Sequence, residues 1–162
     1  MTKTKKTLAA ILGSTTAAAA LYGLTPSYEG TVYKTYRDVG GVLTYCTGAT
    51  ENAQFGKTYS KDECVAQLDR DLARHAEGML SCIHVPLTEG QKIAFTDFTF
   101  NVGVGAFCGS SVARKANAGD VVGSCDALLM WNKVKGEVVN GLTRRRIEER
   151  KICLTNERTS SQ

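Results

Sequence analysis

The sequence has few of the residues that bind metal ions. It contains only two histidines, His75 and His84, and none of its six cysteines belongs to a C-x-x-C pair. A zinc site needs clustered thiolates or imidazoles, so this pattern argues against one. We expect a protein that needs no metal ion, and we interpret both histidines as structural or surface residues.

Charged side chains are absent from one long segment near the N-terminus. None occurs from Thr7 to Tyr28, whereas Lys3, Lys5 and Lys6 precede the segment. Basic residues followed by an uncharged stretch of roughly 20 residues are typical of an exported segment whose N-terminus starts in the cytoplasm. We therefore predict export, with a single membrane span in residues 1–26 ahead of a folded domain in residues 27–162.

The same segment lacks a long run of leucine, valine and isoleucine. Alanine, glycine, threonine and serine gain little from lipid, so the segment is a weak membrane anchor. Two interpretations remain open: a signal peptide cleaved near residues 17–20, or an uncleaved anchor that later leaves the membrane, which we favour. No cysteine lies in residues 1–28, which excludes an anchor that acts by disulfide exchange. Pro26 is expected to end the segment.

The cysteines are six in number and lie 17 to 28 residues apart. An even number of separated cysteines fits disulfides, which persist in an oxidising compartment such as the periplasm. The alternative is that they are reduced and buried as small apolar residues. They are Cys46, Cys64, Cys82, Cys108, Cys125 and Cys153.

The body of the chain has the composition of one ordinary folded domain. It contains no internal repeat or low-complexity linker, and 43% of the residues are hydrophobic and 22% charged. Residues 27–50 are rich in glycine, threonine, tyrosine and valine, which predicts short strands with a turn at Gly40 and Gly41. The rest is helical in pattern. The fold class is therefore α+β, mostly helical, with a small β region near the N-terminus.

Two capping boxes mark the start of long helices. Ser60 with Glu63, and Thr88 with Gln91, have the spacing in which the two side chains cap each other's backbone N–H groups. The first predicts a helix to about Leu80, and the second a strongly apolar helix stopped by the glycines at 103 and 105. Further helices are predicted at residues 110–119, 120–131 and 143–154.

Large apolar side chains recur in these helices. They could be taken for a ligand-binding box, but aromatic and methionine side chains are most often buried in a core. We assign to the core Phe95, Phe98, Phe107, Met130 and Trp131.

Basic residues gather near the C-terminus. Such a cluster fits an anionic polymer, and nucleic acid, anionic lipid and bacterial wall polymers all qualify. Equally, it fits the solvated face of a terminal helix with ion pairs to Glu148 and Glu149. The export signal argues against a nucleic-acid partner. The basic residues are Arg144, Arg145, Arg146, Arg150 and Lys151.

Two carboxylates and a threonine are the candidates for chemistry. Cleavage of a glycosidic bond needs a carboxylic acid on one side of the sugar and a second carboxylate on the other. Glu29 follows an apolar stretch, where partial desolvation favours the protonated acid. Asp38 lies in a polar turn beside Arg37 and should stay ionised, and Thr44 follows six residues later. Taken alone, such carboxylates are more often surface residues.

Longer motifs around these residues make the pattern specific. Together they resemble the phage-type lysozymes, the muramidases of lambdoid and related phages, over the chain from about Tyr28 to Leu154. The weakly apolar N-terminus further resembles secreted endolysins whose signal anchor is later released from the inner membrane into the periplasm. The motifs are Tyr28-Glu29-Gly30, Tyr36-Arg37-Asp38, residues 41–46, Thr47-Gly48, Phe100-Asn101-Val102-Gly103, Gly105-Ala106-Phe107, residues 129–131 and residues 141–146.

The resemblance implies a lysozyme-like fold, with a small N-terminal β region and a larger helical lobe, and a function. The protein would hydrolyse the β-1,4 bond between N-acetylmuramic acid and N-acetylglucosamine in peptidoglycan, as a monomer and without a cofactor. Glu29 would be the general acid, Asp38 would place or activate the attacking water, and Thr44 would position that water. An arginine of the 144–146 run, Arg145 by preference, would pair with Glu29. Several relatives carry a histidine where this chain has Ala49.

The same resemblance implies a disulfide pattern and leaves two rival functions. The pairs would be Cys46 with Cys64, Cys82 with Cys108, and Cys125 with Cys153. One rival is a lytic transglycosylase, which needs only the acid and closes an anhydro ring without water. The other is a protein that binds peptidoglycan without cutting it.

Overall fold

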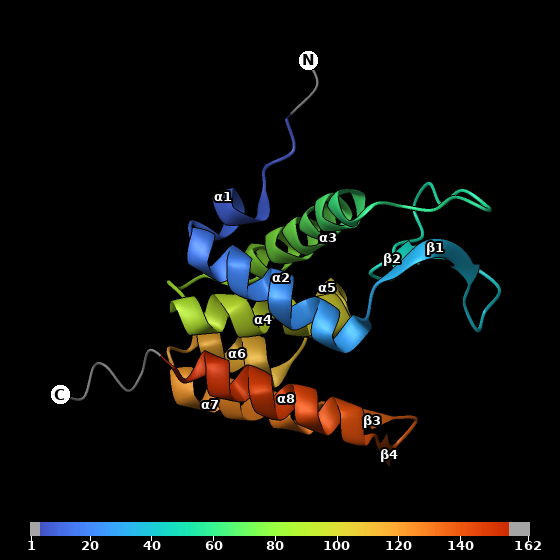
Figure 1. Ribbon diagram of the computed structural model, residues 1–162. Helices are drawn as coiled ribbons and strands as arrows, with labels where there is room; N and C mark the ends of the chain where they lie inside the picture. The colour runs from blue at the N-terminus through green and yellow to red at the C-terminus, as the bar shows by residue number, and fades with distance from the viewer. Residues whose placement is uncertain (1–3, 156–162) are drawn as a thin grey trace.

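The computed structural model describes residues 4–155. Helices form most of it, and two antiparallel hairpins project from the same side of the helical body (Figure 1). The helices are α1 (Leu8–Leu12), α2 (Thr15–Glu29), α3 (Lys61–Ser81), α4 (Glu89–Val102), α5 (Val104–Cys108), α6 (Ser111–Asn117), α7 (Val121–Ala127), the 3-10 turn η1 (Leu128–Met130) and α8 (Asn140–Cys153). The hairpins pair β1 (Val32–Arg37) with β2 (Leu43–Cys46), and β3 (Lys133–Val134) with β4 (Glu137–Val138).

Helix α4 lies at the centre of the helical lobe. It packs against α2, α3, α5 and α8, and Phe95 and Phe98 on it are fully buried. Phe107 of α5 meets both rings, with centroid distances of 5.7 and 6.2 Å. The strongly apolar sequence of α4 is the reason for this place, because a helix that is apolar on every side is covered on every side. The predicted central helix is confirmed.

Both predicted capping boxes are present. Ser60 Oγ accepts a hydrogen bond from the Glu63 N–H, and the Glu63 carboxylate accepts one from the Ser60 N–H. Thr88 and Gln91 make the same pair of bonds at the start of α4. These bonds satisfy backbone donors that have no partner inside the helix.

The N-terminal segment is part of the core in this structure. Helices α1 and α2 pack on α3 and α4, and Leu8, Leu12 and Leu21 are buried. Lys92 on α4 donates a hydrogen bond to the carbonyl of Leu12 at 2.9 Å. Among residues 4–155, no helix is both long and apolar enough to span a membrane.

Pro26 does not end the N-terminal helix as the sequence predicted. Helix α2 runs through it to Glu29, and the N–H of Gly30 donates to the Pro26 carbonyl at 2.8 Å. A proline removes one N–H donor and its ring crowds the carbonyl four residues earlier, but the N–H groups of later residues can still bond, as that of Gly30 does. Glu29 is thereby the last residue of a helix and not part of a loop.

The β1–β2 hairpin forms its own small lobe. Tyr36 pairs with Thr44 and Val32 with Cys46, with an irregularity in the register between them. Beneath it lies a second, small core that includes the stacked rings of Tyr45 and Tyr59. The predicted β region is confirmed.

Three disulfides join the elements, in the pairs that the resemblance implied. The first ties β2 to α3, the second ties the end of α3 to α5 around the central helix, and the third ties α7 to α8. The pairs are Cys46–Cys64, Cys82–Cys108 and Cys125–Cys153, with Cα–Cα distances of 5.0, 5.7 and 5.7 Å.

The region from 120 to 143 differs most from the prediction. The expected helix at 120–131 ends at Ala127 and tightens into the η1 turn, where Leu128 is buried but Met130 is 74% exposed. The assignment of Met130 to the core was wrong, because a turn with three residues per repeat points neighbouring side chains in different directions. The β3–β4 hairpin was not foreseen, and α8 begins at Asn140 rather than Thr143.

Candidate active site

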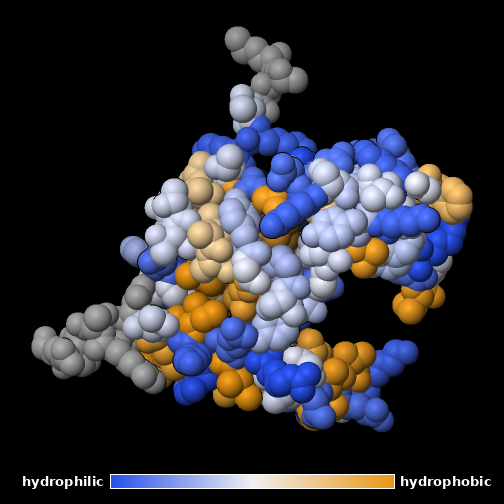
Figure 2. All heavy atoms as spheres, viewed as in Figure 1, coloured by the Kyte–Doolittle hydropathy of each residue, from blue (hydrophilic) through white to orange (hydrophobic). Residues whose placement is uncertain are grey.

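A cleft opens between the two hairpins. Figure 2 shows the surface hollowed between the β1–β2 and β3–β4 hairpins, and the C-terminal end of α2 lies at the back of this gap in Figure 1. Both hairpins carry exposed apolar side chains, Val39 and Val42 on one and Val134 and Val138 on the other. An open cleft of this kind suits an extended ligand.

Glu29 ends α2 at the back of this cleft. Its carboxyl oxygen Oε1 accepts a hydrogen bond from Arg145 Nη1 at 2.5 Å, and its side chain is 29% exposed. The carboxyl group is therefore held by one buried partner yet open to the cleft. Arg145 is the arginine that the family resemblance favoured as the partner of Glu29.

Arg145 is buried and fully engaged. Its Nε and Nη2 atoms donate to the two carboxyl oxygens of Asp97 at 2.9 and 3.1 Å, and the Tyr28 ring centroid lies 5.2 Å from its guanidinium carbon. Burial by itself lowers the pKa of Arg145, but the hydrogen bonds and charges of Asp97 and Glu29 outweigh it and raise that pKa. The guanidinium thus stays charged and is fixed in one orientation.

Asp97 is a residue of the site that the sequence reasoning missed. It lies on α4 with no exposed surface, and its Oδ1 accepts a hydrogen bond from Thr25 Oγ1 at 2.7 Å. Burial tends to raise the pKa of Asp97, but hydrogen bonds from Glu149 and Arg145 hold it below its usual value. The signal was available: an acidic residue inside a strongly apolar helix must be buried, and a buried charge needs a partner.

Arg146 and Glu149 form a second buried contact on α8. Arg146 and Glu149 are both fully buried, with Arg146 Nε 2.7 Å from Glu149 Oε2, and the guanidinium of Arg146 stacks over the ring of Phe98. Burial raises the pKa of Glu149 well above its usual value, and the neighbouring Asp97 acts in the same direction. Two of the arginines read as a basic surface cluster are therefore internal. Only Arg144 of that trio is exposed.

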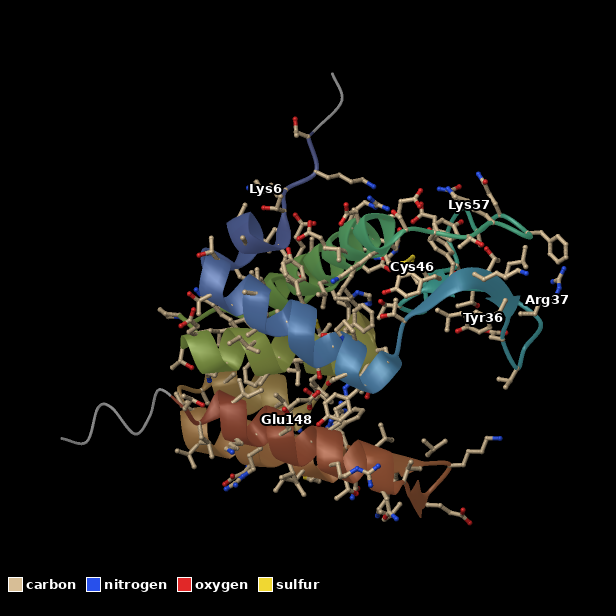
Figure 3. All side chains as sticks on the ribbon, viewed as in Figure 1. Lys6, Tyr36, Arg37, Cys46, Lys57 and Glu148 are labelled. Atoms are coloured by element: carbon tan, nitrogen blue, oxygen red, sulfur yellow. A yellow bond between two sulfur atoms is a disulfide. The ribbon has the colours of Figure 1, made fainter. Side chains whose placement is uncertain are left out.

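Asp38 lies in the loop that follows β1. Its Oδ1 accepts backbone hydrogen bonds from Gly40 and Val42, both at 2.9 Å, and the residue is exposed. These bonds fix the turn. Figure 3 shows the neighbouring Tyr36 and Arg37 on the β1–β2 hairpin and Glu148 on α8 in the helical body.

Thr44 follows on β2 and is tied to the same turn. It is 4% exposed, and its Oγ1 donates to the Val42 carbonyl at 3.0 Å. Val42 thus links Asp38 and Thr44 through its own N–H and C=O groups. The structure gathers Asp38 and Thr44 on the hairpin and Glu29 with Arg145 on the helical lobe.

Ala49 lies in the turn that follows β2. It is buried, and its backbone exchanges two hydrogen bonds of 2.9 Å with Tyr45. The position therefore contributes a tight turn at the end of β2 and no titratable group.

Another hollow, of about 1080 Å³, lies between α3 and residues 51–59. It contains none of the residues predicted to be catalytic. Its charged groups are paired in part with one another, Arg74 with Asp71 at 3.3 Å and Lys57 with Glu63 at 3.4 Å. Within residues 4–155, no group of three or more histidine, cysteine or acidic side chains is placed to hold a metal ion.

Comparison with known proteins identifies the family. The model of the family described as phage lysozyme matches residues 26–149. The chain belongs to the phage lysozyme family. It is 41% identical to the SAR-endolysin of Bacteriophage PS119 over 152 residues, which cover 91% of each chain.

Solved structures agree with this assignment. The muramidase domain of SpmX from Asticaccaulis excentricus is 31% identical with a TM-score of 0.78, over 84% of this chain and 95% of that one. A variant of phage P22 lysozyme is 30% identical with a TM-score of 0.76, over 88% and 97%. The predicted lysozyme-like α+β fold is confirmed.

Proposed function

We propose that the protein hydrolyses the β-1,4 bond between N-acetylmuramic acid and N-acetylglucosamine, with Glu29 as the general acid. Its family and its endolysin relatives make it a peptidoglycan-lysing phage endolysin. The observation that carries the finer assignment is the placement of Glu29, which ends α2 at the back of the cleft and is held by Arg145.

The acid step follows from this geometry. Glu29 gives its proton to the glycosidic oxygen as the bond to the sugar breaks. Arg145 fixes the carboxyl group in one rotamer, so little reorganisation is needed when the substrate binds. Once the proton has left, the same guanidinium stabilises the carboxylate that remains.

The residues that place the attacking water lie on the β1–β2 hairpin. Asp38 is exposed on the β1–β2 hairpin and its carboxyl group accepts two backbone hydrogen bonds, which suits a carboxylate that places or activates water and opposes the positive charge on the sugar. Thr44 shares the turn through Val42 and would position the water. The β1–β2 hairpin is a separate lobe, and the hollow between it and the β3–β4 hairpin can admit a polysaccharide strand (Figure 2).

Product analysis separates hydrolysis from the transglycosylase reaction. Digestion of purified peptidoglycan in ¹⁸O-labelled water should give fragments with reducing muramic-acid ends that carry the label. Unlabelled fragments with anhydro ends would contradict hydrolysis and favour the transglycosylase.

Export through the N-terminal segment is the second part of the proposal. A relative named a SAR-endolysin, for signal-anchor release, matches 91% of the chain, which supports passage to the periplasm. We propose that residues 1–26 first span the host inner membrane with the N-terminus in the cytoplasm, and that the released protein is a monomer. A strongly apolar anchor in place of residues 7–25 should leave the protein in the membrane and inactive, because Leu8, Leu12 and Leu21 would be missing from the core. Full activity of that fusion would contradict the proposal.

A further inference from the structure

One guanidinium serves two carboxyl groups in the helical lobe. Asp97 takes two of its donor atoms, Nε and Nη2, with both of its own oxygens, and Nη1 is left for Glu29. Asp97 is fully buried whereas the Glu29 side chain is 29% exposed. The stronger and more desolvated pairing of Arg145 is therefore with Asp97 and not with the acid.

A general acid must carry a proton before it can act. An isolated arginine beside a carboxyl group favours the ionised form, and an ionised Glu29 has no proton to give. A carboxylate on the far side of the guanidinium offsets its charge and leaves its N–H groups in place. The ionisable groups around Arg145 are Asp97 on α4, Tyr28 and Glu29 on α2, and Arg146, Glu148 and Glu149 on α8.

Among these groups, only Asp97 is placed to offset the positive charge of Arg145. Glu149 lies 3.6 Å from Arg145 Nε but is closer to Arg146, at 2.7 Å. Glu148 accepts a hydrogen bond from the Tyr28 hydroxyl instead. Asp97 alone forms the two-pronged contact, and Thr25 from α2 adds a hydrogen bond to one of its oxygens.

We propose that Asp97 is a positioning residue for the general acid: it holds Arg145 by two hydrogen bonds and offsets its charge, so that Arg145 orients Glu29 without keeping it ionised. The inference rests on the proposed function, in which Glu29 donates the proton. Asp97 acts through Arg145 and touches no substrate.

The test is the pH profile of turnover in the full chain. Asp97→Asn keeps the shape of the side chain but leaves the charge of Arg145 uncompensated. The alkaline limb of the kcat profile should move to lower pH, so that turnover on that limb falls by about tenfold for each unit of the shift while turnover on the acid side of the profile changes little. Thr25→Val is the matched control, because it removes a hydrogen bond to Asp97 and no charge. Its profile should keep the wild-type shape.

The outcomes that contradict the proposal are distinct. If Asp97→Asn lowers kcat by the same factor at every pH, the role of Asp97 is structural only. If Glu29→Gln keeps wild-type turnover, the proposed function fails and the role of Asp97 fails with it. Should Asp97→Asn not fold, the double variant Asp97→Asn/Arg145→Gln buries neither charge. The alkaline limb of its kcat profile should lie at the same pH as in the wild type or at a higher pH. A limb at lower pH would overturn the proposal.

Discussion

Arg145 on the last helix donates a hydrogen bond of 2.5 Å to Glu29 at the end of the second, across 116 residues of sequence. This contact joins the N-terminal helix α2 to the C-terminal helix α8 at the back of the cleft. The N-terminal segment supplies the acid and the C-terminal helix supplies the group that orients it. The site is therefore complete only when α2 is packed on the helical lobe.

Substitution of Arg145 by lysine should lower kcat by about 10- to 100-fold, with a smaller change in KM. A lysine ammonium cannot bind both oxygens of Asp97 and reach Glu29 at the same time. The free energy of unfolding should fall as well, because a buried pair would be left incompletely matched. Arg144→Lys, at an exposed neighbouring position, is the control and should behave as the wild type. Unchanged kcat in Arg145→Lys would contradict the orienting role.

Leu21→Ala tests whether the N-terminal segment belongs to the folded core. Leu21 has no exposed surface in α2, so the substitution should lower the free energy of unfolding by about 2–5 kcal/mol. Denaturant unfolding of the released protein measures it. Ala20→Ser, on the exposed face next to it, should change stability little. A Leu21→Ala protein as stable as the wild type would mean that the segment is not packed in solution as it is here.

Tyr28 gives a prediction at alkaline pH. Burial first, and then the hydrogen bond to Glu148, raise the pKa of Tyr28 to about 12. Because the folded value lies above the unfolded one of about 10, the protonated hydroxyl favours the folded state. Its contribution to stability is full below about pH 10 and is lost as the pH rises toward about 12. Tyr28→Phe should therefore weaken the alkaline loss of stability, measured by unfolding between these values.

Tyr22 acts in the same way and supplies an internal comparison. Burial, followed by its hydrogen bond to Asp69, also raises its pKa to about 12. The double replacement of both tyrosines by phenylalanine should therefore remove more of the alkaline dependence than either single change. An unaltered dependence in the double variant would show that other groups cause it.

Local signals in the sequence located much of the fold. The capping boxes at Ser60 and Thr88 fixed the starts of α3 and α4, because each is a set of short-range hydrogen bonds that the sequence alone specifies. The β3–β4 hairpin was missed because each of its strands has only two residues, too few for a periodic pattern. Met130 was misplaced because its exposure depends on where α7 tightens into η1, which residue type does not determine.

The candidate catalytic residues could be predicted from the sequence, but the buried residue that holds Arg145 could not. Glu29, Asp38 and Thr44 came from the motif, and their roles remain proposals. The pairing of Arg145 with Glu29 followed from the family resemblance and is present in the structure. Asp97 escaped because its partner, Arg145, is 48 residues away in the sequence. Only the packing of α4 against α8 brings these two residues together.

Turnover by Glu29→Gln is the most direct test of the account. Glu148→Gln is the control, because Glu148 also contacts α2, through a hydrogen bond from the Tyr28 hydroxyl. Each variant removes one carboxylate from the full chain. Wild type and Glu148→Gln should release fragments with reducing muramic-acid ends, whereas Glu29→Gln should bind peptidoglycan equally well and release none. Release of the same fragments by Glu29→Gln at the wild-type rate would contradict the assignment of Glu29 as the general acid.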